Sequence, residues 1–180
     1  MGVNYVTKYK KLLIVVSILF IIAIVIFLWL PPSQERMEKY FLRDKAELNV
    51  VCEYLSTVDC DATIEYDRTD YYLIKYELVQ STNKLDLVKL KIEDEVVVDA
   101  VKKLFIKRGY HKIYKNENTV VFAKWHRGPD LSGGVAYRIN ESAEIEIGYV
   151  TKLSPLMDEN WYYYEVNYNE WRSNNFENFI

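Results

Sequence analysis

The two histidines are the residues best suited to bind a metal or to exchange protons near neutral pH. His111 and His126 flank a β-rich segment, and a hairpin there would bring their rings opposite each other. A zinc site needs further cysteine, histidine or acidic ligands at suitable spacing, and none lies beside this pair. We therefore predict an ordinary surface pair, without a metal or a cofactor.

Nucleophilic catalysis has two partial matches in the chain. The segment from Ser81 to Lys84 fits the S-x-x-K string of penicillin-binding enzymes, in which the lysine helps to activate the serine. That motif also needs a helix start and a K-T-G strand, whereas this segment reads as a polar turn and K-T-G is absent from the sequence. The segment from Ser132 to Gly134 lacks the G-x-S-x-G elbow, so we interpret it as part of a glycine-rich connection.

Carboxylates are plentiful, since aspartate and glutamate make up 26 of the 180 residues. Two of them in one cleft could act as a hydrolase pair, and such a site would show adjacent carboxyl groups with a raised pKa. The sequence contains no P-loop and no dinucleotide fingerprint. We expect a protein without enzymatic activity, and we keep a hydrolase with paired carboxylates as the alternative.

Six aromatic residues gather between positions 161 and 171. A strand over 161–168 would place alternate residues on opposite faces of a sheet. Aromatic residues commonly fill such a sheet, and this is the interpretation that we favour. The alternative is an exposed surface for a glycan or a protein, because rigid rings bury area at low entropic cost. The candidate residues of that surface are Trp161, Tyr163, Glu165, Asn167 and Trp171.

Cys52 and Cys60 are the only cysteines. On one straight helix, eight residues would separate them by about 12 Å, which is beyond the reach of a disulfide. A disulfide therefore requires the chain to turn back near Val58. Otherwise Cys52 is a small buried hydrophobic residue and Cys60 is a free thiol in a loop, which is the interpretation that we favour.

The run from Leu12 to Leu30 has nineteen residues, no charge and Ser17 as its only clearly polar side chain. At about 1.5 Å per residue it matches a bilayer core of about 30 Å, and insertion is favourable by about 5–10 kcal/mol. We predict a transmembrane helix over 12–30 that contacts membrane lipid. A cleaved signal peptide is the alternative, but the bulky residues before Pro31 do not resemble a cleavage site, so the segment reads as a signal-anchor.

Charge predicts the orientation of this helix. The first thirty residues hold three lysines and no acidic residue, and positive flanks stay in the cytoplasm. Residues 1–11 are thus predicted to be cytoplasmic and 33–180 extracytoplasmic, in a single-pass protein of the cell membrane. The whole chain carries a net charge of −3, so the part after residue 30 is three charges more negative, at −6. This acidity argues against nucleic acid and anionic headgroups as partners.

Residues 33–180 suffice for one domain with its own core. Helical periodicity predicts helices over 33–58, with Ser33 as N-cap, and over 96–108, with Gly109 as C-cap. Runs rich in β-branched and aromatic residues predict strands at 63–66, 71–79, 110–114, 119–125, 135–139 and 161–168. This order predicts an α+β domain with a mostly antiparallel sheet and two helices, which follows the N-terminal transmembrane helix.

A positive start and an apolar span precede two short motifs, Gly-Gly-Val-Ala-Tyr-Arg-Ile-Asn at 133–140 and Trp-Tyr-Tyr-Tyr at 161–164. In this arrangement the chain resembles uncharacterised small membrane-anchored envelope proteins of Gram-positive bacteria. The similarity covers mainly residues 110–165, and it implies a location rather than an activity. We predict a membrane-tethered extracytoplasmic interaction module that contacts an envelope protein or a wall polymer, with an envelope hydrolase as the alternative.

Overall fold

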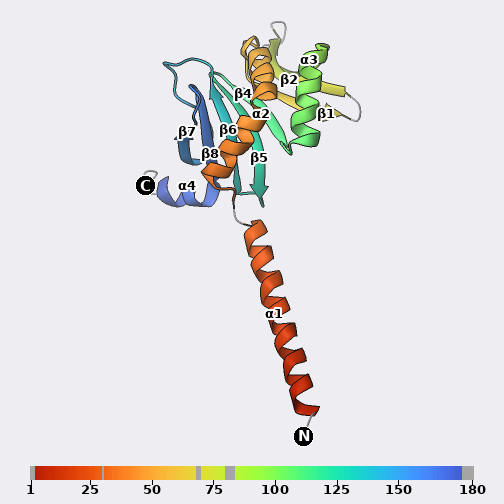
Figure 1. Cartoon of the computed structure of the whole chain (residues 1–180). Coiled ribbons are helices and arrows are strands. Elements are labelled where there is room, and N and C mark those ends of the chain that lie inside the picture. Colours follow the sequence, from red (N-terminus) through yellow and green to blue (C-terminus); the bar gives the residue numbers. More distant parts are fainter. Residues whose placement is uncertain (1–2, 30, 68–69, 80–83, 176–180) are drawn as a thin grey trace. The chain divides into compact units, whose positions relative to one another are not determined.

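The computed structural model describes residues 3–29, 31–67, 70–79 and 84–175. The chain divides into two compact units, 1–32 and 33–180. The first unit contains one helix, and the second contains a sheet with the remaining helices (Figure 1). Residues 81–83 of the S-x-x-K match and Leu30, the last residue of the predicted span, lie outside the described residues.

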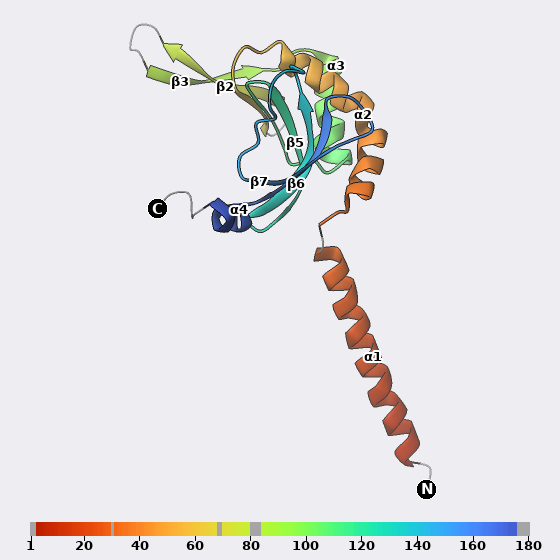
Figure 2. The same ribbon diagram turned by 90° about the vertical axis from the view of Figure 1, so that its left-hand side faces the viewer.

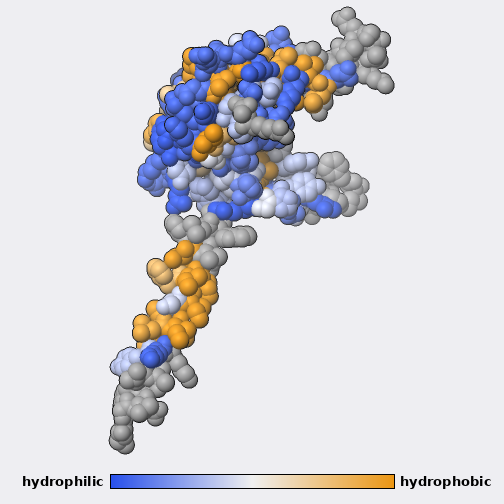
Figure 3. Space-filling model, turned by 90° about the vertical axis from the view of Figure 1, so that its right-hand side faces the viewer, coloured by the Kyte–Doolittle hydropathy of each residue, from blue (hydrophilic) through white to orange (hydrophobic). Residues whose placement is uncertain are grey.

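The helix of the first unit is α1 (Val3–Trp29). Its large apolar side chains between Leu12 and Ile24 are exposed, and apolar surface is visible along this helix in the space-filling view (Figure 3). Among the residues that the structure describes, no helix is both long and apolar enough to cross a membrane.

The second unit is built on one eight-stranded sheet in which all pairs are antiparallel. This confirms the predicted class, an α+β fold with an antiparallel sheet. The strand order is β3-β2-β1-β4-β5-β6-β8-β7 (Figures 1 and 2). The strands are β1 (Ala62–Asp67), β2 (Asp70–Val79), β3 (Lys84–Lys91), β4 (Lys112–Asn116), β5 (Thr119–Arg127), β6 (Leu131–Arg138), β7 (Val150–Pro155) and β8 (Trp161–Asn167).

The first predicted helix is confirmed as α2 (Gln34–Ser56), and its predicted cap is confirmed too, because the Ser33 hydroxyl accepts a bond from the backbone N–H of Arg36 at 3.4 Å. The second begins as α3 (Glu95–Lys102), where the Asp94 carboxylate accepts bonds from two backbone N–H groups. It continues as a π-helical turn, η1 (Lys103–Lys107). Gly109 follows at φ +74°, the left-handed conformation that suits a glycine after a helix end.

Three elements of the second unit have no counterpart in the sequence prediction: the edge strands β3 and β7, and the helix α4 (Tyr168–Asn175). The described part of the unit thus has three α-helices where two were predicted. Strand β8 ends at Asn167, one residue before the predicted end, because the chain turns into α4 there.

Both faces of the sheet are packed. Helices α2 and α3 cover one face (Figure 1), where the main core includes Phe41, Phe122 and Trp161. On the other face a smaller cluster forms around Val121, Ala136, Ile147 and Tyr164. The segment between β6 and β7 covers this cluster and is fixed to the sheet, because the backbone N–H of Glu146 donates to the hydroxyl of Thr119 at 2.9 Å.

The predicted glycine-rich connection at 128–134 is wrong for its last residues. Ser132, Gly133 and Gly134 lie within strand β6, and only the segment around Gly128, at φ +64°, forms the turn. A Cβ atom at Gly133 would lie 2.5 Å from the Trp125 ring, and one at Gly134 would lie 2.0 Å from the carbonyl oxygen of Phe122. Glycine is therefore needed here for close packing of β6 against the bulged strand β5.

Candidate functional site

Two residues of the predicted aromatic surface are buried. Trp161 is 2% exposed and Tyr163 is fully buried, and both belong to the main core under α2. The alternative, in which they form part of an exposed surface, is wrong for these two residues, because the helices cover the sheet face on which they lie. The favoured interpretation, that aromatic residues of this strand fill the sheet, is confirmed for both of them.

Glu165 and Asn167 lie at the end of strand β8, where both make structural contacts. Glu165 accepts a 2.6 Å bond from the hydroxyl of Tyr163 and lies 3.2 Å from the amine of Lys152. Burial and this bond raise the pKa of Tyr163. Asn167 accepts a bond from the backbone N–H of Glu170 at 3.1 Å and donates to the Glu170 carboxylate at 3.1 Å. The bond from the backbone N–H of Glu170 makes Asn167 the N-cap of helix α4.

Trp171 is the one residue of the predicted surface that joins a group of aromatic side chains at the surface, and it is itself partly buried there. Tyr149 lies between Tyr168 and Trp171, with ring centroids 4.9 and 4.8 Å away and both pairs edge to face. Tyr149 is 47% exposed and Tyr168 is 37% exposed. We call Tyr149, Tyr168 and Trp171 the aromatic cluster.

Two separate parts of the domain hold the aromatic cluster in place. Tyr149 directly precedes strand β7, and the other two residues lie in α4, which contacts β7 and β8 (Figures 1 and 2). The start of α4 is tied to the turn between β5 and β6, because the backbone N–H of Tyr168 donates to the carbonyl of Asp130 at 2.9 Å. The amide of Asn169 also donates to the Asp130 carboxylate, at 3.0 Å.

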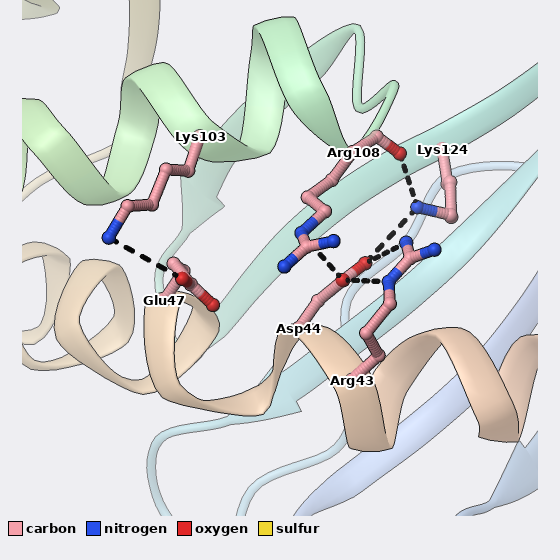
Figure 4. Close-up of polar contacts among 6 residues, drawn as sticks. All are labelled: Arg43, Asp44, Glu47, Lys103, Arg108 and Lys124. Atoms are coloured by element: carbon pink, nitrogen blue, oxygen red, sulfur yellow. Dashed lines mark hydrogen bonds and ion pairs between the residues drawn. The ribbon is translucent and has the colours of Figure 1, made fainter.

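A buried carboxylate lies in the middle of helix α2. Asp44 is fully buried on the helix face that contacts the sheet, and it is surrounded by three cationic side chains (Figure 4). Arg43 donates to both of its oxygens, at 2.6 and 2.9 Å. Lys124 donates to Oδ2 at 3.2 Å, and Nε of Arg108 lies 3.2 Å from Oδ1. We call these four residues the Asp44 network.

Lys124 has further partners that suit a buried ammonium group. Its amine donates to the backbone carbonyl of Arg108 at 2.6 Å. It also lies over the rings of Tyr110 and Tyr40, 4.0 and 4.8 Å from their centroids, where the ring faces attract a cation. The Asp44 network thus joins α2, the end of η1 and strand β5.

The sequence itself indicates that Asp44 is unusual, because a charged residue interrupts the apolar stripe of its helix. The apolar stripe of α2 steps from Phe41 to Leu48, and Asp44 occupies the position between them on the same face. A charged residue at such a position is almost never buried without a partner. Its partners lie 64 and 80 residues further along the chain, so no local pattern could identify them.

The two histidines face each other as predicted, with ring centroids 4.8 Å apart and an edge-to-face arrangement. Within the described residues, no group of three or more histidine, cysteine or acidic side chains is placed to hold a metal ion. Burial, with the neighbouring His126 and Lys112, lowers the pKa of His111.

Both cysteines are free thiols. Cys52 is buried on α2, and burial raises its pKa well above the usual value, which makes the reactive thiolate scarce. Cys60 is partly exposed just before strand β1. The disulfide that the sequence left open is not formed.

Three acidic residues line one cleft of about 480 Å³ between α2 and strands β6 and β8. Glu53, Asp158 and Glu159 line it, together with the free cysteine Cys52. The Asp158 carboxylate pairs with the amine of Lys45 at 2.7 Å, so one of the three already has a cationic partner.

The fold and these sites define an α+β domain with an antiparallel sheet, an exposed aromatic cluster and a buried ionic network. Comparison of the chain with protein-family models, curated proteins and solved structures finds no match.

Proposed function

We propose that this protein is a membrane-tethered extracytoplasmic interaction module whose aromatic cluster contacts an envelope protein or a wall polymer. The observation that carries the proposal is the exposure of Tyr149 and Tyr168 beside the partly buried Trp171 at one site, held by β7 and α4. Aromatic side chains are the most frequent anchors of binding surfaces, because two rotatable bonds fix a large contact area.

The backbone of Tyr149 supports a role for its side chain. Its φ angle is +59°, a left-handed conformation that is uncommon for a bulky residue and unfavourable by roughly 1–2 kcal/mol. Strain of this kind is concentrated at functional sites, where the rest of the fold holds the residue in place. In this conformation Tyr149 contacts both other rings of the aromatic cluster while its own ring stays accessible.

Site-specific photo-crosslinking in cells tests this surface directly. A photoreactive amino acid is placed at position 149 or 171 of the full chain, and adducts are identified by mass spectrometry. We expect adducts to one partner from both positions. Tyr66 provides a matched control, because it is an aromatic residue that is 52% exposed on β1 at another part of the sheet.

The proposal fails if positions 149 and 171 give no adducts, or if position 66 gives the same adducts in equal yield. Trp171→Ala in the full chain supplies an independent measurement. This change should weaken retention of the protein on purified cell wall or on the crosslinked partner, while Tyr66→Ala leaves retention unchanged.

The tether itself is supported by α1, whose 27 residues include the apolar run that begins at Leu12 and whose large apolar side chains between Leu12 and Ile24 are exposed. A reporter fused after Ile180 tests the orientation. We expect a reporter that works only outside the cytoplasm to be active, and the protein to stay with membranes at alkaline pH. Activity of a cytoplasm-only reporter in its place would contradict the proposal.

A hydrolase is the second candidate, because Glu53, Asp158 and Glu159 line one cleft. Glycoside hydrolysis needs one carboxylic acid and one carboxylate on either side of the bond. If the cleft is catalytic, full chain incubated with purified wall should release soluble fragments, and Glu53→Gln with Glu159→Gln should abolish the release. Equal release by the wild type and this double variant would exclude the cleft.

A further inference from the structure

The Asp44 network contains more positive than negative charge. Arg43, Arg108 and Lys124 bring three cations to a single carboxylate, which leaves a local surplus of two positive charges. Lys124 is 7% exposed and points inward, whereas the side chains of Arg43 and Arg108 are 44% and 32% exposed. The surplus charge therefore lies at the solvent side of the network.

Asp44 holds the two guanidinium groups next to each other. Nε of Arg43 and Nε of Arg108 lie 2.6 and 3.2 Å from the same carboxylate oxygen. Arg43 donates hydrogen bonds to both oxygens of Asp44, whereas Arg108 forms an ion pair through Nε without a hydrogen bond. In the part of the chain that the structure describes, the two terminal nitrogens of Arg108 have no hydrogen bond to protein, and none is drawn to the residues in Figure 4.

The surroundings of Lys124 show the same excess of positive charge. Burial is the main factor that lowers the pKa of Lys124, and the charges of Arg43 and Arg108 act in the same direction against the opposing effect of Asp44. The other carboxylate drawn in Figure 4, that of Glu47, lies 3.8 Å from the amine of Lys103. Lys103 in turn pairs with Asp99 at 2.8 Å.

We propose that Arg43 and Arg108 form a binding site for a phosphate group on the solvent side of Asp44. A phosphate monoester or diester carries one to two negative charges, which matches the surplus. Its oxygens accept parallel N–H bonds from the planar guanidinium group, and arginine forms such bonds better than lysine does. The site does not involve the aromatic cluster, so its test is independent of the proposed contact between that cluster and a partner.

Titration with inorganic phosphate tests the site. The full chain is kept in a neutral detergent, sodium chloride keeps the ionic strength constant, and binding is followed by ³¹P NMR and by the melting temperature. We expect saturable binding and a rise in melting temperature. Arg108→Gln should weaken binding about tenfold, since a hydrogen bond to a charged group contributes that order of affinity.

Arg108→Lys separates geometry from charge, because it keeps the cation but removes the planar donors. We expect it to lose most of the affinity as well. Arg36→Gln is the matched control on α2 and should bind as the wild type does. Arg43 still contacts both oxygens of Asp44 in the Arg108 variants, so we expect them to fold, which circular dichroism checks.

The proposal is overturned if phosphate binding does not saturate, or if both Arg108 variants bind as tightly as the wild type. It is also overturned if Arg36→Gln weakens binding as much as Arg108→Gln. Should the glutamine variant not fold, Arg108→Lys and the wild-type titration decide the question by the same criteria.

Two further titrations identify the source of the phosphate. A soluble polyol-phosphate oligomer should compete with inorganic phosphate if the natural ligand is a phosphate group in solution or in a polymer. Vesicles of phosphatidylcholine with phosphatidylglycerol should abolish the response to inorganic phosphate, relative to phosphatidylcholine alone, if the ligand is a lipid headgroup. Competition in either experiment that is lost in Arg108→Gln supports the site, and competition in neither overturns it.

Discussion

The amine of Lys124 lies 3.2 Å from Oδ2 of Asp44, although eighty residues separate them in the sequence. The pair joins the middle of α2 to β5, a central strand of the sheet. Both side chains are almost completely buried, and Asp44 is the only carboxylate that pairs with Lys124 in the described residues, so Lys124 would be left as an isolated charge without it. An isolated buried charge is strongly unfavourable. Removing one member of this pair therefore tests whether the contact fixes α2 to the sheet.

Asp44→Ala should lower the free energy of unfolding by about 3–5 kcal/mol, because it leaves the buried ammonium group of Lys124 without its counter-ion. Urea unfolding of the full chain, followed by circular dichroism, measures the change. Glu47→Ala, on the same helix, removes a carboxylate that lies 3.8 Å from an amine which is 38% exposed, and should have an effect of less than about 1 kcal/mol. Equal losses in the two variants would show that the Asp44 network does not fix the helix.

Gly134→Ala should destabilise the domain by at least about 1–3 kcal/mol. Its Cβ atom would lie 2.0 Å from a backbone oxygen of Phe122, and backbone cannot move aside as a flexible side chain can. Gly148→Ala is the control, because nothing lies within 4 Å of its Cβ position. Its melting temperature should stay close to that of the wild type, and a similar drop in both variants would refute the packing argument.

Stability should decrease as the pH falls through the usual histidine pKa of 6.5. Burial lowers the pKa of His111 in the folded state, with help from His126 and Lys112. The unfolded chain therefore binds this proton more tightly than the folded chain does. The stability that is present above pH 6.5 is lost progressively as the pH falls from 6.5 to the lower pKa of the folded state. His111→Gln should flatten the slope of unfolding free energy between about pH 7.5 and 5.5. An unchanged slope in urea titrations of this variant would contradict the assignment.

Loss of the Asn167 N-cap should loosen α4 without unfolding the domain. Asn167→Ala removes the bonds to the backbone and side chain of Glu170, and a lost cap is worth about 1 kcal/mol. Hydrogen exchange of the α4 amides should become faster, while global unfolding changes little. Ser173→Ala, in the same helix, should not speed this exchange. If Asn167→Ala leaves the exchange rates unchanged, the cap does not stabilise α4.

The two thiols should differ in their accessibility to an alkylating reagent. Cys60 is partly exposed and should be labelled in the folded protein, whereas Cys52 is buried with a raised pKa and should be labelled only after unfolding. Mass spectrometry after proteolysis distinguishes the two sites. Treatment with a reductant beforehand should not alter the pattern, because both thiols are free. Labelling of Cys60 that depends on reductant would reveal a disulfide.

Local patterns predicted elements whose stabilising contacts are themselves local. The apolar stripe and the Ser33 cap located α2, and Gly109 located the end of the second helix. The N-cap residue Asn167 offered the same kind of signal for α4, but the adjoining aromatic run favoured a strand there. The edge strands β3 and β7 contain mixed polar and apolar residues without a clear alternation. Their strand conformation therefore depends on pairing with the neighbouring strand.

The sequence alone determined the apolar segment, the position of two helices, the α+β class and the opposition of the two histidines, because each follows from spacing along a short stretch of chain. Tertiary structure decided which aromatic residues are exposed. An alternating strand specifies two faces but not what covers them. Here helices bury Trp161 and Tyr163, while the partly buried Trp171 contacts the exposed Tyr149. The partners of Asp44 were decided in the same way, since only the packing of α2 on the sheet brings Arg108 and Lys124 to it.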